Sequence, residues 1–296
     1  MDRNFKVPKE MVEGYICAGR EKVEMLVSKM IILGMMAGAF VAFGASSSSL
    51  AVHAIDNAGA AKVIAGAIFP VGLMLIIFIG GELFTGDCLM IMGHIKGEYS
   101  FNEMVARLLL VLGSNLIGAM IVAVFVYFAG QFDMSGGALG AYTIKVAYGK
   151  VSLSFLRAFI SGILCNILVC GAVLMAASAK DVAGKILAIF FPIFAFVIGG
   201  YEHCVANMYY IPAGILALGN SAYREKAMEL YGYTQEQLAT INYYNFFVHN
   251  IIPVTLGNIV GGMVFVGLPL YYLHVSKVDK TQKKEIPVKT RTAMDV

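Results

Sequence analysis

Two apolar stretches of this chain, residues 62–94 and 184–219, are too long for a single membrane crossing and too polar in their middles. Each exceeds 30 residues and carries a glycine pair with a glutamate one or two positions later. A helix rises 1.5 Å per residue, so about 20 residues cross the hydrocarbon core of a bilayer. Both stretches therefore predict membrane helices that are interrupted part-way across.

The composition also indicates a membrane protein. The chain is 59% hydrophobic and 14% charged, whereas soluble domains are about half apolar and about a quarter charged. No signal-peptide core precedes the first apolar segment, so we expect that segment to remain in the mature protein. Six apolar segments are predicted to span the membrane: residues 27–52, 62–94, 104–130, 152–178, 184–219 and 246–274.

These segments divide the chain into three parts. We expect a cytoplasmic N-terminal segment over residues 1–26, a six-helix transmembrane domain over 27–275, and a basic, disordered cytoplasmic tail over 276–296. The tail has no apolar face, and nucleic-acid binding is not expected. We expect the chain to lie in the inner or plasma membrane of the cell. If both termini are cytoplasmic, 16 of the 22 Lys and Arg residues lie inside and 6 outside. The positive-inside rule favours this orientation.

The two halves of the chain carry similar motifs in the same order. A Phe-Pro pair precedes each glycine pair, at residues 69–70 and 191–192, and the next span of each half contains Asn-x-x-Gly, at Asn115 and Asn258. With three spans per half, the second half enters the membrane from the opposite side. The sequence therefore predicts an all-α inverted 3+3 repeat, whose corresponding broken helices point to a transport site.

The first interruption, residues 80–87, places Glu82 and Asp87 in an otherwise apolar stretch. A charged acid at the centre of a membrane helix costs about 2.5–3.5 kcal/mol. Gly80 and Gly81 allow the chain to leave the helix, and we expect Glu82 to accept hydrogen bonds from loop amides that have lost their helical partners. Thr85 is expected to offer its hydroxyl to a pore, to cap the following half-helix, or both. The alternative is that the acids lie at a membrane interface.

The second interruption, residues 199–207, contains Gly199, Gly200, Glu202, His203 and Asn207. His203 is the only histidine deep inside an apolar segment, at a position that we equate with the threonine of the first interruption. A lone buried histidine is more often structural, but the helix break and the adjacent carboxylate favour a functional role. Histidine can also change its charge near physiological pH.

Half-helices that begin after each interruption direct their free amide groups and positive dipole ends toward the membrane centre. This arrangement attracts a small anion and repels a cation. No metal site or cofactor is expected, because His203 and Cys204 are adjacent and no further ligand lies nearby in the sequence. The five cysteines form no CxxC pair and, with four of them in apolar segments, are expected to be free thiols.

Four motifs, in order along the chain, resemble the signatures of the formate/nitrite transporter family. They are GGELFTG at residues 80–86, GILCNILVC at 162–170, EHCVANM at 202–208 and IPVTLGN at 252–258. The resemblance extends over nearly the whole chain up to about residue 274. Cys204 stands where some relatives carry serine, a minor departure from the pattern.

The resemblance implies an aquaporin-like protomer of six helices, assembled as a homopentamer with one pore in each protomer. It implies that His203 is the central pore histidine, with Thr85 as its partner on the interrupted second helix. Asn166 would belong to the hydrogen-bonding set around this histidine. Lys150, which lies 16 residues before Asn166, matches the vestibule lysine of the family, although by its sequence alone it reads as an ordinary loop lysine.

The family also has apolar constrictions on either side of the histidine. Leu83 is the firmest counterpart here, and Phe69, Leu73 and Phe196 are assigned by their spacing. Apolar rings resist a bare anion because they do not replace its hydration shell, so a neutral weak acid passes at a lower free-energy cost.

We therefore expect a channel or transporter for small monovalent anions of weak acids, with formate or nitrite as substrate and proton co-movement through His203. A hydrosulfide channel is the alternative within the family. A water or glycerol pore shares the implied architecture, but the chain has no Asn-Pro-Ala motif. An enzyme would need a clustered acid/base or metal set, and only the pair His203 and Glu202 is present.

Overall fold

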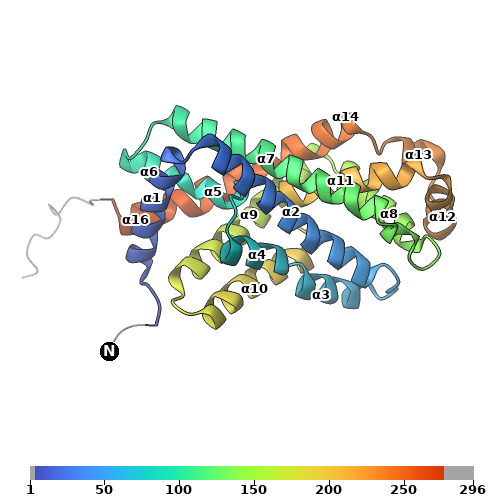
Figure 1. Cartoon of the computed structure of the whole chain (residues 1–296), viewed down its shortest axis with the longest axis horizontal. Helices are drawn as coiled ribbons and strands as arrows, with labels where there is room; N and C mark the ends of the chain where they lie inside the picture. Colours follow the sequence, from blue (N-terminus) through green and yellow to red (C-terminus); the bar gives the residue numbers. More distant parts are fainter. Residues whose placement is uncertain (1–3, 277–296) are drawn as a thin grey trace, which may run out of the picture.

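The computed structural model describes residues 4–276, which form an elongated bundle of helices (Figure 1). Within this range the extended structure is limited to an isolated antiparallel bridge between Phe5 and Ala179. Six segments are long and apolar enough to cross a membrane, as the sequence predicts. They are α2 (Val27–Val52), α3 with α4 (Ala58–Ile79), α7 (Phe101–Phe128), α9 (Phe155–Ser178), α10 (Val182–Gly199) and α14 to α16 (Tyr243–His274).

The second and fifth spans are interrupted, as expected. After α3 (Ala58–Ile68) and α4 (Val71–Ile79), the second resumes as α5 (Phe84–Asp87), a 3₁₀ turn (Cys88–Met90) and α6 (Ile91–Lys96), and the fifth resumes after α10 as α11 (Cys204–Gly219). The sixth span joins α14 (Tyr243–Asn245), α15 (Ile252–Ile259) and α16 (Leu268–His274) through π-helical turns, Phe246–Ile251 and Val260–Gly267.

A glycine with positive φ ends the first half-helix at each interruption. Gly80 has φ 106° and Gly200 has φ 66°, conformations that glycine adopts at little cost because it has no Cβ. The irregular backbone covers only four residues in each case, Gly80–Leu83 and Gly200–His203. The expected interruptions, 80–87 and 199–207, were too long, because the second half-helices already begin at Phe84 and Cys204. Thr85, Asp87 and Asn207 thus lie in first helical turns.

In the first repeat, Asn115 of α7 supplies the hydrogen bonds that the interruption removes. Its side chain accepts from the amide of Phe84 at 3.0 Å and donates to the carbonyl of Glu82 at 2.8 Å. Its second amide hydrogen reaches the carbonyl of Gly34 on α2, at 2.7 Å. A single asparagine thus compensates the broken backbone inside the membrane, where an unpaired polar group is costly.

In the second repeat, Asn258 of α15 has the same role. It accepts from the amide of Cys204 at 3.0 Å and donates to the carbonyl of Glu202 at 3.0 Å. Its other amide hydrogen bonds the carbonyl of Gly162 on α9, at 2.8 Å. The equivalence of these bonds with those of Asn115 shows the internal repeat at the level of single atoms.

These bonds set the register between the repeats. Because Phe84 corresponds to Cys204, His203 corresponds to Leu83. The equation of His203 with Thr85 was therefore wrong by two residues. Nor does Thr85 cap its half-helix: the N-cap residue of α5 is Leu83, which has no side-chain hydrogen bond.

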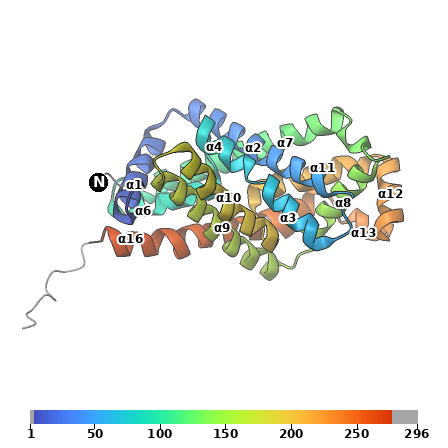
Figure 2. The same ribbon diagram turned by 90° about the horizontal axis from the view of Figure 1, so that it is seen from below.

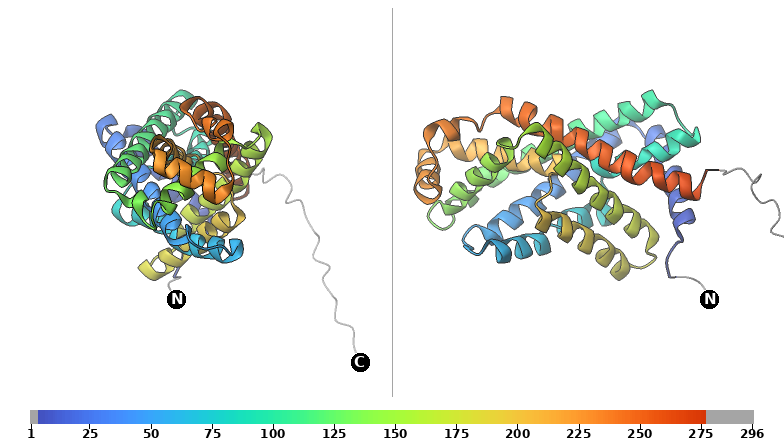
Figure 3. Two further views of the ribbon diagram at one scale, coloured as in Figure 1. Left: turned by 90° about the vertical axis from the view of Figure 1, so that its right-hand side faces the viewer. Right: turned by 180° about the vertical axis from the view of Figure 1, so that it is seen from behind.

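Four helices were not predicted from the sequence. They are α1 (Pro8–Glu24), α8 (Ala138–Val151), α12 (Ser221–Tyr231) and α13 (Gln235–Ala239). Helix α1 buries Val12 and Ile16 against Leu89 and Met92. It lies at the same end of the bundle as α6 and α16, whereas α8, α12 and α13 lie at the opposite end (Figures 2 and 3). The predicted disordered tail, apart from Ser276, lies outside the described residues.

Candidate functional site

The two half-helices meet at a hydrogen bond between Thr85 and His203. The threonine Oγ1 lies 2.9 Å from the imidazole Nε2, and both residues are buried. The other ring nitrogen, Nδ1, accepts a hydrogen bond from the amide of Ala206 at 3.1 Å and so caps α11. Since Nδ1 acts as an acceptor there, the neutral ring carries its proton on Nε2 and donates it to Thr85. The threonine hydroxyl then keeps its own hydrogen available for another acceptor.

A cavity of about 160 Å³ lies on the α8 side of this hydrogen bond. Its lining includes His203, Lys150, Phe69 and Phe196. The rings of Phe69 and Phe196 meet edge to face with centroids 5.3 Å apart, and Phe196 lies 6.1 Å from the imidazole centroid. The structure thus brings the two phenylalanines together beside the histidine, where the resemblance places one apolar constriction.

Lys150 lies in the last turn of α8 and not in a loop. Its ammonium donates to Glu202 at 2.6 Å, and the same carboxylate accepts from Asn207 at 2.7 Å and from Asn250 at 3.4 Å. Glu202 therefore pairs with a lysine and two amides. Glu202 is adjacent to His203 in the sequence but makes no hydrogen bond with its ring, because the ring nitrogens bond Thr85 and the amide of Ala206.

One acceptor beside this network has no partner. The Oδ1 atom of Asn207 is buried and makes no hydrogen bond, while the Nδ2 group donates to both Glu202 and Asn250. Asn207 also lines the α8-side cavity. A buried unpaired acceptor is costly. A molecule that enters this cavity with a hydrogen-bond donor can therefore supply the partner that Asn207 Oδ1 lacks.

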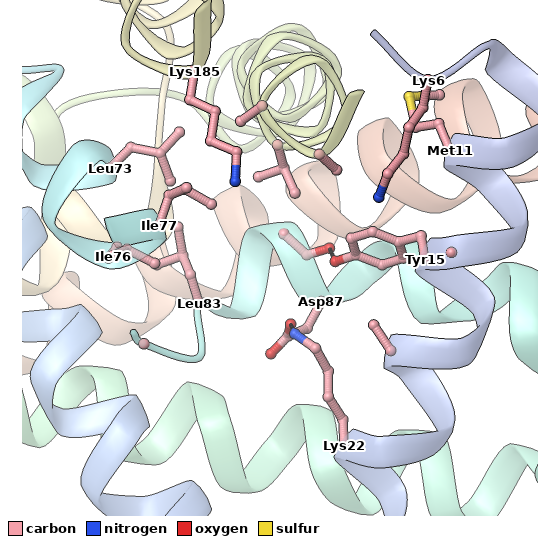
Figure 4. Close-up of a pocket in the computed structure, with 17 residues that line it drawn as sticks. Lys6, Met11, Tyr15, Lys22, Leu73, Ile76, Ile77, Leu83, Asp87 and Lys185 are labelled. Atoms are coloured by element: carbon pink, nitrogen blue, oxygen red, sulfur yellow. Dashed lines mark hydrogen bonds and ion pairs between the residues drawn. The ribbon is translucent and has the colours of Figure 1, made fainter. Parts of the chain in front are cut away.

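A larger cavity, of about 370 Å³, lies on the α1 side (Figure 4). Leu73, Ile76 and Leu83 form part of its wall, and all three are buried. Leu73 and Leu83 thus line one cavity, whereas Phe69 and Phe196 line the other. The four residues expected to form constrictions therefore divide into two pairs, one lining each cavity.

The sequence-based reasoning missed a lysine in this cavity. Lys22 of α1 donates to both Glu82 and Asp87. Burial acts to lower its pKa, but Asp87, Tyr15 and Glu82 raise it, and the pKa lies well above its usual range. The expectation that Glu82 bonds loop amides was wrong, because Asn115 takes that role. The i, i+4, i+7 spacing of Val12, Ile16 and Gly19, all buried, was the available signal for a packed helix.

The two charge clusters are related by the repeat. Lys22 with Glu82 on the α1 side corresponds to Lys150 with Glu202 on the α8 side, and Asp87 corresponds to Asn207. Each cavity therefore has a lysine that is ion-paired with nearby carboxylate. An ion pair still has positive and negative ends, so each pair can orient a small anion.

Asn166 of α9 contacts the central hydrogen bond indirectly, through the main chain of Thr85. Its Nδ2 group donates to the carbonyl of Thr85 at 3.1 Å and to the carbonyl of Asn258 at 2.6 Å. The thiol of Cys170 donates to the same Thr85 carbonyl and to Asn166 Oδ1, at 3.4 and 3.6 Å. Asn166 thus positions the main chain of the threonine and makes no bond to the imidazole itself.

Among the residues that the structure describes, no group of three or more His, Cys, Asp and Glu side chains could hold a metal ion. All five cysteines lie in this part of the chain and are free thiols, with Cys17 exposed and the others buried. The site therefore consists of hydrogen-bonding groups, two ion-pair clusters and apolar side chains that line the two cavities.

Comparison with known proteins decides the family. The model of the family "Formate/nitrite transporter" matches residues 9–272. The chain belongs to the formate/nitrite transporter family. The formate channel FocA of Haemophilus influenzae is 36% identical, over 73% of this chain and 75% of its own length. The formate channel BtFdhC of Bacillus thuringiensis is 33% identical, over 90% and 95%.

A solved structure described as a pentameric formate channel with formate bound shares the fold of this family member. Its TM-score is 0.76 at 35% sequence identity, and the match covers 84% of this chain and 98% of that chain. The expected architecture of an aquaporin-like, six-span membrane protein with interrupted second and fifth helices is confirmed. The family and these relatives are channels and transporters, so the chain is a multi-pass membrane transport protein and not an enzyme.

Proposed function

We propose that this chain conducts formate across the cell membrane through a pore of its own, with nitrite as a further substrate of the same chemical class. The observation that carries the proposal is the Thr85–His203 hydrogen bond, which lies between two apolar constrictions and two ion-pair clusters. Relatives described as formate channels support the choice of substrate.

The ion pairs prepare the anion for the constrictions. On the α8 side, Lys150 orients the anion while Glu202 keeps the cavity from holding it tightly. Between Phe69 and Phe196 there is no group to replace the hydration shell of an anion, so the protonated acid crosses at a lower cost. Asn207 Oδ1 is an acceptor suited to the acidic hydrogen of that neutral form.

The central pair then replaces lost hydration. His203 donates to Thr85, and the threonine hydroxyl donates to an oxygen of the passing acid or anion. We place the source of the proton in cavity water. Protonation of the ring at Nδ1 would break the cap of α11 at Ala206, so His203 serves better as a fixed donor than as a proton carrier.

The assembly and orientation belong to the same proposal. We infer a homopentamer with one pore per protomer, which the description of the solved relative supports. Both termini face the cytoplasm, a placement favoured by the distribution of Lys and Arg. In this orientation the cytoplasm contains the N-terminal segment (1–26) and the basic tail (276–296), and the membrane contains the domain of residues 27–275.

Formate flux into proteoliposomes tests the central step. We expect His203→Ala and Thr85→Ala each to reduce flux by about tenfold or more, since each leaves a buried partner unpaired at about 1–3 kcal/mol. Undiminished flux in both variants would refute the role of the pair. Uptake of formate, nitrite and hydrosulfide measured side by side identifies the substrate, and a clear preference for hydrosulfide would replace formate in this proposal.

A further inference from the structure

The α1-side cavity contains two lysines that the transport scheme does not use. Lys6 precedes α1 and Lys185 lies at the end of the first turn of α10, and both line the cavity. Figure 4 shows their ammonium groups directed from separate walls into the space beside Tyr15. Within residues 4–276 neither forms an ion pair, whereas Lys22, deeper in the same cavity, is paired with Glu82 and Asp87.

The backbones that carry these two lysines are held in place. The amide of Lys6 donates to the carbonyl of Ser178 at 2.9 Å, and the Ser178 hydroxyl donates to the Lys6 carbonyl at 2.8 Å. Helix α10 is capped by Asp181, which accepts from the amide of Gly184 at 2.7 Å and leaves Lys185 in a regular turn. The two positive groups are therefore presented from fixed elements and not from a free loop.

The space between the lysines exceeds what formate requires. The cavity measures about 370 Å³, against about 160 Å³ on the α8 side. Figure 4 shows apolar lining near both lysines, with Leu73 and Ile77 near Lys185 and Met11 beside Lys6. Leu83 and Ile76 also form part of the cavity wall. The cavity therefore has room for an anion larger than formate.

We propose that the α1-side cavity binds a small dicarboxylate, with one carboxylate on Lys6, the other on Lys185 and the hydrocarbon middle against the apolar wall. Two unpaired cations separated by apolar lining match a ligand with two anionic ends and an apolar centre. The bound dicarboxylate occupies the mouth of the pore and blocks flux from that side. The site does not depend on which small anion the pore conducts.

Calorimetric titration of the purified full-length protein tests binding apart from transport. Succinate is the probe, and butyrate, with the same chain length and one carboxylate, is its matched control. We expect succinate to bind and butyrate to bind more weakly, by up to about fivefold, because one partly exposed ion pair is lost. Equal binding of the two, or no binding of succinate, would overturn the proposal.

Charge-removing variants locate the site. Lys6→Gln and Lys185→Gln are each expected to weaken succinate binding by about fivefold. Lys9→Gln is the matched control. Lys9 lies in the first turn of α1, close to Lys6 in the sequence, but it pairs with Glu13 at the surface and does not line the cavity. Wild-type affinity in both Lys6→Gln and Lys185→Gln would place any succinate site elsewhere.

Flux measurements connect binding to block. Succinate at saturating concentration on the α1 side should inhibit formate flux in the wild type and in Lys9→Gln, and should inhibit the Lys6→Gln and Lys185→Gln variants only at about fivefold higher concentration. Formate flux without succinate reports separately on the transport scheme, so a failure of that scheme is distinguishable. Full flux with succinate bound would overturn the block.

Discussion

At the scale of single residues, the pore depends on side chains whose hydrogen-bonding capacity is almost fully assigned. His203 uses one ring nitrogen for the cap of α11 and the other for Thr85. Glu202 has three donors around it, and Asn207 retains a free acceptor. Substitutions that keep the shape and remove one polar atom are therefore the most informative.

Thr85→Val removes the hydroxyl and keeps the branched shape. The Nε2 hydrogen of His203 then has no acceptor, at a cost of about 1–3 kcal/mol, and we expect formate flux in proteoliposomes to fall by about tenfold. Thr85→Ser retains the hydroxyl and serves as the control with nearly normal flux. If the valine variant transports as well as the serine variant, the hydroxyl has no role in conduction.

Lys150→Met removes the cation that pairs with Glu202. A buried carboxylate without its partner destabilises the fold by about 3–5 kcal/mol, so we expect a lower Tm for the purified protein. The double variant Lys150→Met with Glu202→Gln should recover much of the loss, because no uncompensated charge remains. A double variant no more stable than the single one would show that the ion pair is not the source of the effect.

Several residue-level features were available from the sequence and others were not. His203 and Thr85 stand out because polar groups in an apolar segment are costly and need a reason. Lys22 gave no such signal, because it lies in a polar segment 60 residues before Glu82 and is brought there only by the packing of α1. The role of His203 as a helix cap could not be predicted, because it depends on the residue at which α11 begins, and hydropathy does not determine that residue.

At the scale of elements, the interrupted spans depend on glycine conformations. Gly80→Ala would place a Cβ at φ 106°, a region that disfavours L residues by about 1–2 kcal/mol. We expect a lower Tm and reduced flux, since the α4 to α5 connection holds Leu83 and Thr85. Gly171→Ala on α9, where the added Cβ meets open space, should be neutral or slightly stabilising. Equal effects of the two substitutions would contradict this account.

The long apolar helices were predictable because a segment that spans lipid must satisfy its own backbone and expose apolar side chains. The shorter helices α8, α12 and α13 were not, since they lie at the end of the bundle and their sequences mix polar and apolar residues. The length of each interruption also escaped prediction. It is set by Asn115 and Asn258, which reach in from other helices.

At the scale of the whole molecule, the two ends of the bundle face opposite sides of the membrane. Cys17 on α1 is the only exposed thiol among the five cysteines, all of which lie in the described part of the chain. We expect a membrane-impermeant maleimide to label it only after cells are permeabilised. Ser221→Cys, at the exposed start of α12, should be labelled in intact cells. The reverse pattern would invert the proposed orientation.

The bonds of Asn166 have a mechanical consequence for the molecule as a whole. Through its Nδ2 group this residue of the second repeat bonds the carbonyl of Thr85, in the first repeat, and the carbonyl of Asn258, in its own. A transport cycle in which one half rocks against the other would have to break and remake the buried bond to Thr85 at every turnover. We therefore propose that the halves stay fastened together at their centre and that a stationary free-energy barrier governs passage, so that flux rises with the concentration gradient without waiting for the protein to reset.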